Sequence, residues 1–223
     1  MSLILNIDTS MQTASVSFAE NGTVLASASN HSQKDHAGFL HTAIQSLAGE
    51  NSISLKKLDA VAVTEGPGSY TGLRVGMASA KGLCYALDKP FITVGTLPAM
   101  ALSMIHSAKE IDAATVFCPM IDARRMEVYT ALYNQQLEEL TSPYALILDA
   151  DSFSSLLEKG PVYFSGSGAL KWQKNITHKH AVFLPDPEII ATTAILSFQK
   201  FQSGNFSSLG YSEPFYVKEF YSN

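Results

Sequence analysis

The sequence of 223 residues carries 15 Lys and Arg against 20 Asp and Glu, which gives a formal net charge of −5. Hydrophobic residues make up 46% of the chain and charged residues 16%, so it can bury a sizeable core and is not an intrinsically disordered protein. The acidic balance disfavours the broad basic surface that binding to a nucleic-acid backbone requires, so we expect no direct nucleic-acid binding by the chain alone.

The start of the chain does not have the pattern of a secretory signal, because no basic segment precedes the first apolar run and Asp8 interrupts that run. No apolar run approaches the length needed to cross a membrane. Cys84 and Cys118 both lie among apolar residues, which is typical of buried, reduced thiols. We therefore expect a cytoplasmic protein without a membrane segment.

The first half of the chain alternates strands and helices. Asn21-Gly22 separates two alternating segments, which is a strong hairpin signal. The apolar residues of segment 34–49 share one helical face, and Pro90 marks the end of a long glycine-rich helix. The predicted order is strands at 3–8, 14–20 and 23–29, a helix at 34–49, a strand at 58–66, a helix at 69–87, a strand at 90–95 and a helix at 96–108.

The second half repeats this order. Ile121-Asp122 matches Ile7-Asp8, since each pair ends a strand and precedes a short turn and an alternating strand. We predict strands at 114–122, 126–134, 144–148, 161–166 and 181–185, and helices at 152–159, 167–175 and 188–202.

Two similar βββαβαβ units indicate an internal duplication with partly parallel sheets. We therefore predict an α/β protein with the two-lobed, ribonuclease H-like architecture of actin, sugar kinases and Hsp70. The polar segment 106–113 predicts lobes at 1–107 and 108–223, with the last segment packing back towards the first lobe.

The stretch GPGSYTGLRVG at 66–76 opens the glycine-rich helix. It is not a Walker A loop, which needs Lys-Ser/Thr after its last glycine, nor a dinucleotide fingerprint, whose last two glycines are separated by two residues. Backbone N–H groups at such a helix start can still hold an anion. Each glycine inside a helix costs about 1 kcal/mol relative to alanine, so packing must offset the cost of Gly72, Gly76 and Gly82.

Small residues form two ridges on this helix. Gly72, Gly76 and Ala80 lie four residues apart along one ridge, and Ala78, Gly82 and Ala86 form the other. Small residues at this spacing allow another backbone to approach closely. One ridge can face the protein's own sheet, and the second indicates either a helix from another chain or an unusually tight internal fit.

Four blocks of the chain resemble the TsaB (YeaZ) family. They are NIDTS at 6–10, EGPGSYTGLRVGMASAKGL at 65–83, IDARRMEVY at 121–129 and SEPFYVKE at 212–219. The resemblance implies a non-catalytic subunit that binds and activates TsaD for threonylcarbamoyl transfer to N6 of adenosine 37 in tRNAs reading ANN codons. It also implies TsaE as a second partner, a homodimer when alone, and ATP or ADP with Mg in the assembled complex. We expect no cofactor in the isolated chain, and its acidic balance predicts no direct tRNA binding by the chain alone.

The same resemblance implies that segments 33–48 and 69–87 carry the partner interface. A bulky residue at Gly76 is then expected to abolish TsaD binding and leave the fold largely intact. The predicted interface residues are His36, Phe39, Leu40, Tyr70, Thr71, Gly72, Leu73, Arg74, Gly76, Met77 and Ala80.

No catalytic or metal site is predicted. Metal-binding relatives of TsaD type carry a His-x-x-x-His pair, whereas His31, His36 and His41 are spaced by five residues and so point to different faces of a helix. Ser69 lacks the Gly-x-Ser-x-Gly pattern of a nucleophile elbow, and its place before a helix favours an N-cap role.

Asp8, Thr9 and Ser10 form the candidate nucleotide contact. In phosphate-handling members of this architecture, a carboxylate and hydroxyls after the first strand hold a metal and phosphate. The counterpart Asp122-Ala123-Arg124 lacks hydroxyls, and SGSGAL at 165–170 is a second candidate phosphate turn. Two alternatives stay open: a structural turn, or the nucleotide site of an autonomous ATP-binding phosphotransferase or ATPase.

Overall fold

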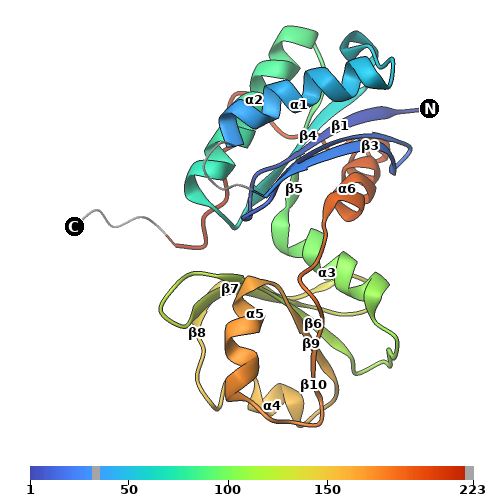
Figure 1. The fold of residues 1–223 in the computed structure, drawn as a ribbon. Coiled ribbons are helices and arrows are strands. Elements are labelled where there is room, and N and C mark those ends of the chain that lie inside the picture. Colours follow the sequence, from blue (N-terminus) through green and yellow to red (C-terminus); the bar gives the residue numbers. More distant parts are fainter. Residues whose placement is uncertain (32–35, 219–223) are drawn as a thin grey trace. The chain divides into compact units, whose positions relative to one another are not determined.

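Two five-stranded mixed sheets form the framework of the protein (Figure 1). The structure is a computed structural model and describes residues 1–31 and 36–218. The first sheet contains, in spatial order, β3 (Thr23–Asn30), β2 (Ala14–Glu20), β1 (Leu3–Asp8), β4 (Ala60–Gly66) and β5 (Phe91–Gly95). The first three strands are antiparallel, whereas β4 and β5 run parallel to β1. Asn21 and Gly22 both have positive φ, as the predicted hairpin turn requires.

The second sheet repeats this topology. Its strands are, in the equivalent order, β8 (Glu139–Ile147), β7 (Glu127–Tyr133), β6 (Val116–Asp122), β9 (Val162–Ser165) and β10 (Ala181–Phe183). Again the first three strands in chain order are antiparallel and the last two run parallel to the central strand. The repeated order confirms the predicted duplication and the predicted α/β fold class.

Six α-helices and two short 3-10 helices accompany the described strands. The helices between the strands of the second repeat are shorter than those of the first, and the predicted helix at 152–159 is a single turn. The helices are α1 (His36–Glu50), α2 (Tyr70–Leu87), α3 (Thr96–Ser107), α4 (Ser154–Leu157), α5 (Ser167–Trp172) and α6 (Ile190–Gln202), with 3-10 turns at Leu55–Lys57 and Gln173–Asn175. In the described part of the chain, no helix is both long and apolar enough to span a lipid bilayer.

The chain divides into two compact units. The last helix of each repeat belongs to the unit of the other repeat: α3 to unit 2 and α6 to unit 1. Unit 1 comprises Met1–Thr96 and Ile190–Phe215, and unit 2 comprises Leu97–Ile189 with the described residues from Tyr216. The division therefore falls after the first residue of α3, whereas the polar segment 106–113 had indicated residue 107. That segment marks where a helix ends, not where a unit ends.

Helix α6 packs on the first sheet through polar contacts. The Ser197 hydroxyl donates to Asn6 Oδ1 at 2.6 Å, and Lys200 Nζ donates to the Thr93 carbonyl at 2.7 Å. Asn6 lies between Leu5 and Ile7, so its side chain points to the opposite face of β1 from theirs. Helix α6 thus covers the face of the sheet opposite α1 and α2 (Figure 1).

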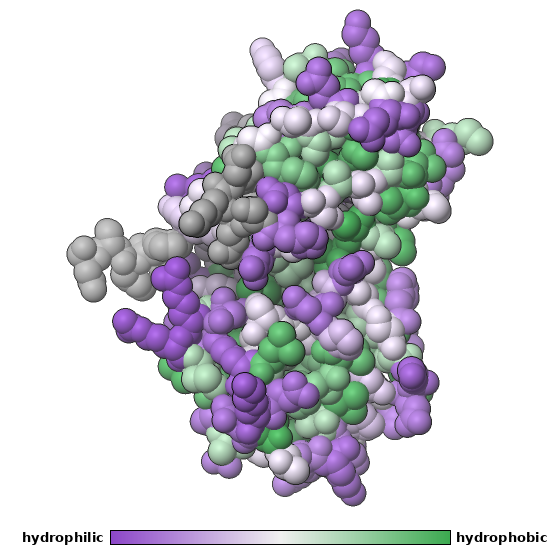
Figure 2. All heavy atoms as spheres, viewed as in Figure 1, coloured by the Kyte–Doolittle hydropathy of each residue, from purple (hydrophilic) through white to green (hydrophobic). Residues whose placement is uncertain are grey.

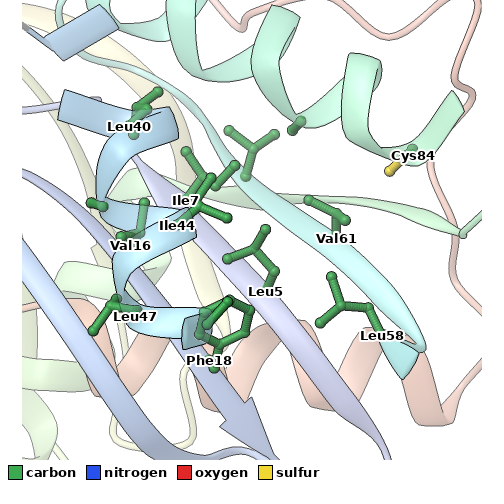
Figure 3. Close-up of a cluster of buried hydrophobic side chains, with 14 of the residues drawn as sticks. Leu5, Ile7, Val16, Phe18, Leu40, Ile44, Leu47, Leu58, Val61 and Cys84 are labelled. Atoms are coloured by element: carbon green, nitrogen blue, oxygen red, sulfur yellow. The ribbon is translucent and has the colours of Figure 1, made fainter. Parts of the chain in front are cut away.

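The apolar core of unit 1 lies between the sheet and helices α1 and α2. Leu5 and Ile7 of β1 meet Leu40 and Ile44 of α1 in this cluster, as Figure 3 shows. The predicted apolar face of the helix at 34–49 is therefore the buried one.

Aromatic side chains build the core of unit 2. The Trp172 ring is fully buried, with its centroid 5.1 Å from that of Phe164 and 5.5 Å from that of Phe153. Its indole Nε1 donates to the Asp149 carbonyl at 2.9 Å, so the one polar atom of the ring is satisfied.

Replacing Ser197 with alanine tests the attachment of α6 to unit 1. Asn6 Oδ1 would lose its donor in a buried site, which we expect to cost about 1–3 kcal/mol in the free energy of unfolding. Urea unfolding measures this cost, with the exposed Ser203→Ala as control. Equal stability of the two variants would show that the Ser197 bond does not hold α6 in place.

Candidate functional site

The first turn of α2 packs directly on the turn that follows β1. Ser69 N–H donates to the Ser10 carbonyl at 2.7 Å, and the Thr9 hydroxyl donates to the Gly72 carbonyl at 2.7 Å. Ser69 also caps the helix, because its Oγ accepts from Gly72 N–H at 3.2 Å. The capping role predicted for Ser69 is confirmed.

Three glycines make this approach sterically feasible. A Cβ built on Gly68 would lie closer than 3.0 Å to the Ser10 carbonyl oxygen, and one on Gly72 closer than that to the Thr9 carbonyl oxygen. A Cβ on Gly76 would meet the Thr9 hydroxyl at a similarly forbidden distance. The glycines at the start of α2 therefore let a helix and a turn of the same chain touch through their backbones.

The candidate nucleotide residues already have partners inside unit 1. Asp8 Oδ1 accepts from Ser10 N–H at 2.9 Å, the Ser10 hydroxyl at 2.6 Å and the Thr64 hydroxyl at 2.6 Å. Asp8, Thr9 and Ser10 are all buried. The arrangement is that of a structural turn, with its hydroxyls donating to protein oxygens.

The second repeat has a related arrangement. Asp122 N–H donates to Ser167 Oγ at 3.0 Å, which ties the start of α5 to the end of β6. A Cβ on Gly166 would clash with the Met120 carbonyl oxygen, and one on Gly168 with the Val128 side chain. The candidate phosphate turn at 165–168 is therefore packed against its own sheet as well.

The C-terminal sequence block meets the glycine-rich block. Phe215 N–H donates to the Glu65 carbonyl at 2.6 Å. Gly66 has a φ of 122°, and a Cβ there would clash with the Phe215 carbonyl oxygen. Two blocks that are far apart in the sequence thus form one backbone contact.

Helices α1 and α2 share an outward, exposed surface, which we call the α1/α2 face. It is built mainly from small and polar side chains. The two helices are joined across it by a contact of 3.4 Å between Ser79 Oγ and His41 Nε2. Its exposed residues are Ala37, Gly38, His41, Thr42 and Gln45 of α1, and Thr71, Arg74, Ala78, Gly82, Tyr85 and Ala86 of α2.

No packing contact within the described residues requires a glycine at position 82 on this face. A Cβ built there would have no atom within 4 Å, in contrast to those on Gly72 and Gly76. Tyr85, one turn further on, is 83% exposed. Hydrophobic residues are also visible between hydrophilic ones over unit 1 in Figure 2.

Arg74 and Tyr70 stand together at the start of α2. The guanidinium carbon of Arg74 lies 3.9 Å from the centroid of the Tyr70 ring, a cation–π geometry between residues four apart. This contact limits the rotamers of an exposed arginine, which lowers the entropy that a further contact would cost.

Comparisons with known proteins identify the family. A family model described as "TsaD: tRNA N6-adenosine threonylcarbamoyltransferase" matches residues 23–198. A protein of Bacillus subtilis named "tRNA threonylcarbamoyladenosine biosynthesis protein TsaB" is 36% identical over 166 residues, which are 73% of this chain and 70% of that protein. The chain belongs to the TsaD family and, within it, to TsaB.

Solved structures agree with this assignment. YeaZ from Pseudomonas aeruginosa superposes with a TM-score of 0.76 at 25% identity, covering 97% of this chain and 100% of that one. A ROK hexokinase from Thermus thermophilus gives a TM-score of 0.51 at 10% identity, covering 91% and 100%. The second likeness shows the fold alone, namely the sugar-kinase architecture predicted from the duplication.

Six of the eleven residues predicted for the partner interface face the interior of unit 1, where Gly72 and Gly76 contact the turn after β1. Their small size therefore does not serve a partner helix, and a leucine at Gly76 would disrupt the fold. The buried residues are Leu40, Gly72, Leu73, Gly76, Met77 and Ala80.

Of the remaining predicted residues, Thr71 and Arg74 are exposed, and Phe39 and Tyr70 are half-buried. His36 begins α1, but its side chain lies outside the described residues, as do residues 33–35 of the predicted segment. The predicted residues do not include Ala78, Gly82 and Tyr85, which are exposed on α2. Ala78 and Gly82 belong to the second predicted ridge of small residues, whereas Tyr85 does not.

The cysteines fit their predicted role as buried thiols. Burial raises the pKa of Cys84 to about 11 and that of Cys118 to about 12. At neutral pH both therefore remain protonated and weakly nucleophilic. Within the described residues, no group of three or more His, Cys, Asp or Glu side chains is placed to hold a metal ion.

A matched pair of glycine substitutions tests the two ridges of α2. Gly72→Ala should lower the free energy of unfolding by about 1–3 kcal/mol, because the new methyl group meets the Thr9 carbonyl. Gly82→Ala should raise it by about 0.5–1 kcal/mol, because its methyl group has space and alanine favours the helix. Thermal or urea unfolding of both variants measures the difference, and a stabilising Gly72→Ala would contradict the packing described.

Proposed function

We propose that this chain is the non-catalytic TsaB subunit that binds and activates a TsaD transferase. TsaD would then transfer the threonylcarbamoyl group from threonylcarbamoyl-AMP to N6 of adenosine 37 in tRNAs reading ANN codons. Membership of a family named for tRNA threonylcarbamoyladenosine biosynthesis supports the pathway. The α1/α2 face supports the role of a binding subunit.

The observation that carries the proposal is Gly82, an exposed glycine in the interior of α2. A glycine in an exposed helix interior costs about 1 kcal/mol relative to alanine. At Gly72 and Gly76 internal packing explains the cost, but at Gly82 nothing within the described chain does. A helix of a partner, seated along Ala78 and Gly82, would supply the missing contact.

The rest of the α1/α2 face suits such a partner. Small residues let helix axes approach to about 8 Å, where backbone and side-chain contacts are densest. Tyr85 at one end and Arg74 at the other are of the residue types that dominate binding energy at interfaces. Between them the surface is low in charge, as the centre of an interface requires.

The resemblance to the TsaB family implies further partners. In the absence of TsaD, we expect the same face to pair two copies of the chain, so that TsaD displaces the second copy. TsaE, with ATP or ADP and Mg, would join the assembled complex and not the isolated chain. We place the complex in the cytoplasm, where its tRNA substrate is found.

The alternative function, an autonomous ATP-binding phosphotransferase or ATPase, would need the turn after β1 to accept phosphate. Thr9 and Ser10 already donate their hydroxyls to protein oxygens, and Gly72 lies against the Thr9 carbonyl. The binding subunit is therefore the function that the geometry supports better.

Replacing Ala78 with glutamate tests the proposed interface. The longer, charged side chain would project from the middle of the α1/α2 face, and we expect the affinity for TsaD to fall at least about 100-fold, or about 2.7 kcal/mol. Co-elution and titration calorimetry of the purified proteins measure this change.

The matched control is Ala191→Glu, which adds the same group to an exposed alanine of another helix of unit 1. It should bind TsaD like the natural chain. Both variants should unfold at the same urea concentration as the natural chain. Undiminished TsaD binding by the folded Ala78→Glu variant would remove this face as the interface.

A further inference from the structure

The turn between β6 and β7 has an unusual backbone. Arg124, Arg125 and Met126 all adopt left-handed conformations, with φ values of 70°, 46° and 60°. Residues with side chains rarely adopt this conformation, and runs of them are rarer still. The surrounding contacts must therefore stabilise the turn.

Several hydrogen bonds hold both ends of this turn. Ala123 N–H donates to the Glu127 carbonyl at 2.9 Å, and Glu127 N–H donates to the Arg124 carbonyl at 2.8 Å. Arg124 N–H donates to Asp122 Oδ1 at 2.7 Å. Lys171 Nζ bridges the two sides, donating to Asp122 Oδ1 at 2.5 Å and to the Glu127 carbonyl at 2.9 Å.

These contacts leave the two arginines on the outside. Arg124 and Arg125 are both exposed, and within the described residues neither guanidinium makes a hydrogen bond or ion pair. The turn therefore presents two consecutive, exposed arginines on a backbone that hydrogen bonds hold at both ends.

The charges around the tip favour an anion. The two nearby carboxylates are already neutralised, Asp122 by Lys171 and Glu127 by Lys218. Partial burial would raise the pKa of Asp122, but the Lys171 ammonium and the Arg124 N–H outweigh it and hold that pKa below its usual value. Four cations and two carboxylates give the tip a balance of +2 in a chain whose net charge is −5.

We propose that the Arg124–Arg125 turn binds phosphate groups of the tRNA backbone when the chain is assembled with TsaD. Guanidinium groups match phosphate oxygens in bidentate geometry, and contacts of this kind orient an RNA without reading its sequence. An exposed turn suits a long polyanion, whereas a free nucleotide needs a concave pocket for its base. This inference rests on the proposed function, because a TsaD transferase that acts on tRNA would bring the RNA to this chain.

Two phosphate contacts are too few to hold tRNA on the isolated chain, but they alter the salt dependence of a complex. Each neutralised phosphate contributes about 0.7–0.9 to the slope of log K against log salt. Replacing both arginines with glutamine should therefore lower the magnitude of the slope by about 1.4–1.8. If the two complexes bind tRNA equally at 1 M salt, the affinity of the variant at 0.1 M is lower by roughly 25- to 60-fold.

The experiment uses the TsaD complex and an unmodified tRNA transcript that reads an ANN codon. Fluorescence anisotropy between 50 and 200 mM salt gives the slope for the natural complex and for R124Q/R125Q. The control K56Q/K57Q removes two adjacent exposed cations of unit 1 and should leave the slope unchanged. R124K/R125K keeps the charge and should retain most of the slope while losing part of the affinity.

The outcomes separate this inference from the proposed function. Co-elution of each variant with TsaD is measured first, and failure of the natural chain to co-elute would overturn both. If R124Q/R125Q co-elutes but its salt slope equals that of the natural complex, only the tRNA contact is wrong. Loss of TsaD co-elution in R124Q/R125Q would instead assign the turn to a protein interface. If the complex with R124Q/R125Q retains the salt slope but loses Mg-ATP binding, the turn would be assigned to a nucleotide and not to tRNA.

Discussion

The contact between the first turn of α2 and the turn after β1 is the constraint on which the rest of unit 1 depends. It is made backbone to backbone, with Gly72 against the Thr9 carbonyl and Ser69 N–H donating to the Ser10 carbonyl. The chain's own helix contacts the turn after β1, and Asp8 serves to fix this turn through the Ser10 and Thr64 hydroxyls.

A similar contact occurs in the second repeat, where a hydrogen bond joins the start of α5 to the end of β6. In both repeats glycine permits the approach, and a hydrogen bond joins the helix start to the turn after β1 in the first repeat and to the end of β6 in the second. Packing both helix starts against their own sheets leaves the outer surface of α2 for other contacts. This is why we propose that the α1/α2 face, and not the turns that resemble phosphate loops, binds the partner.

Local patterns predicted most of the fold. The hairpin at Asn21-Gly22, the apolar face of α1 and the duplicated strand order all follow from short-range periodicity. The ridge of α2 that faces inward could not be predicted, because both ridges consist of small residues. Which ridge faces inward depends on the contact of Gly72 with Thr9, a residue 63 positions earlier in the chain. The exchange of α3 and α6 between the two units likewise depends on long-range contacts, such as that of Ser197 with Asn6.

Titration calorimetry of the isolated chain with Mg-ATP tests the central claim most directly. If the start of α2 permanently fills the space beside Thr9 and Ser10, neither binding at this turn nor hydrolysis should be seen. Micromolar binding that disappears in an Asp8→Asn variant, together with turnover, would contradict it. The turn would then be a working nucleotide site, and the protein an enzyme in its own right.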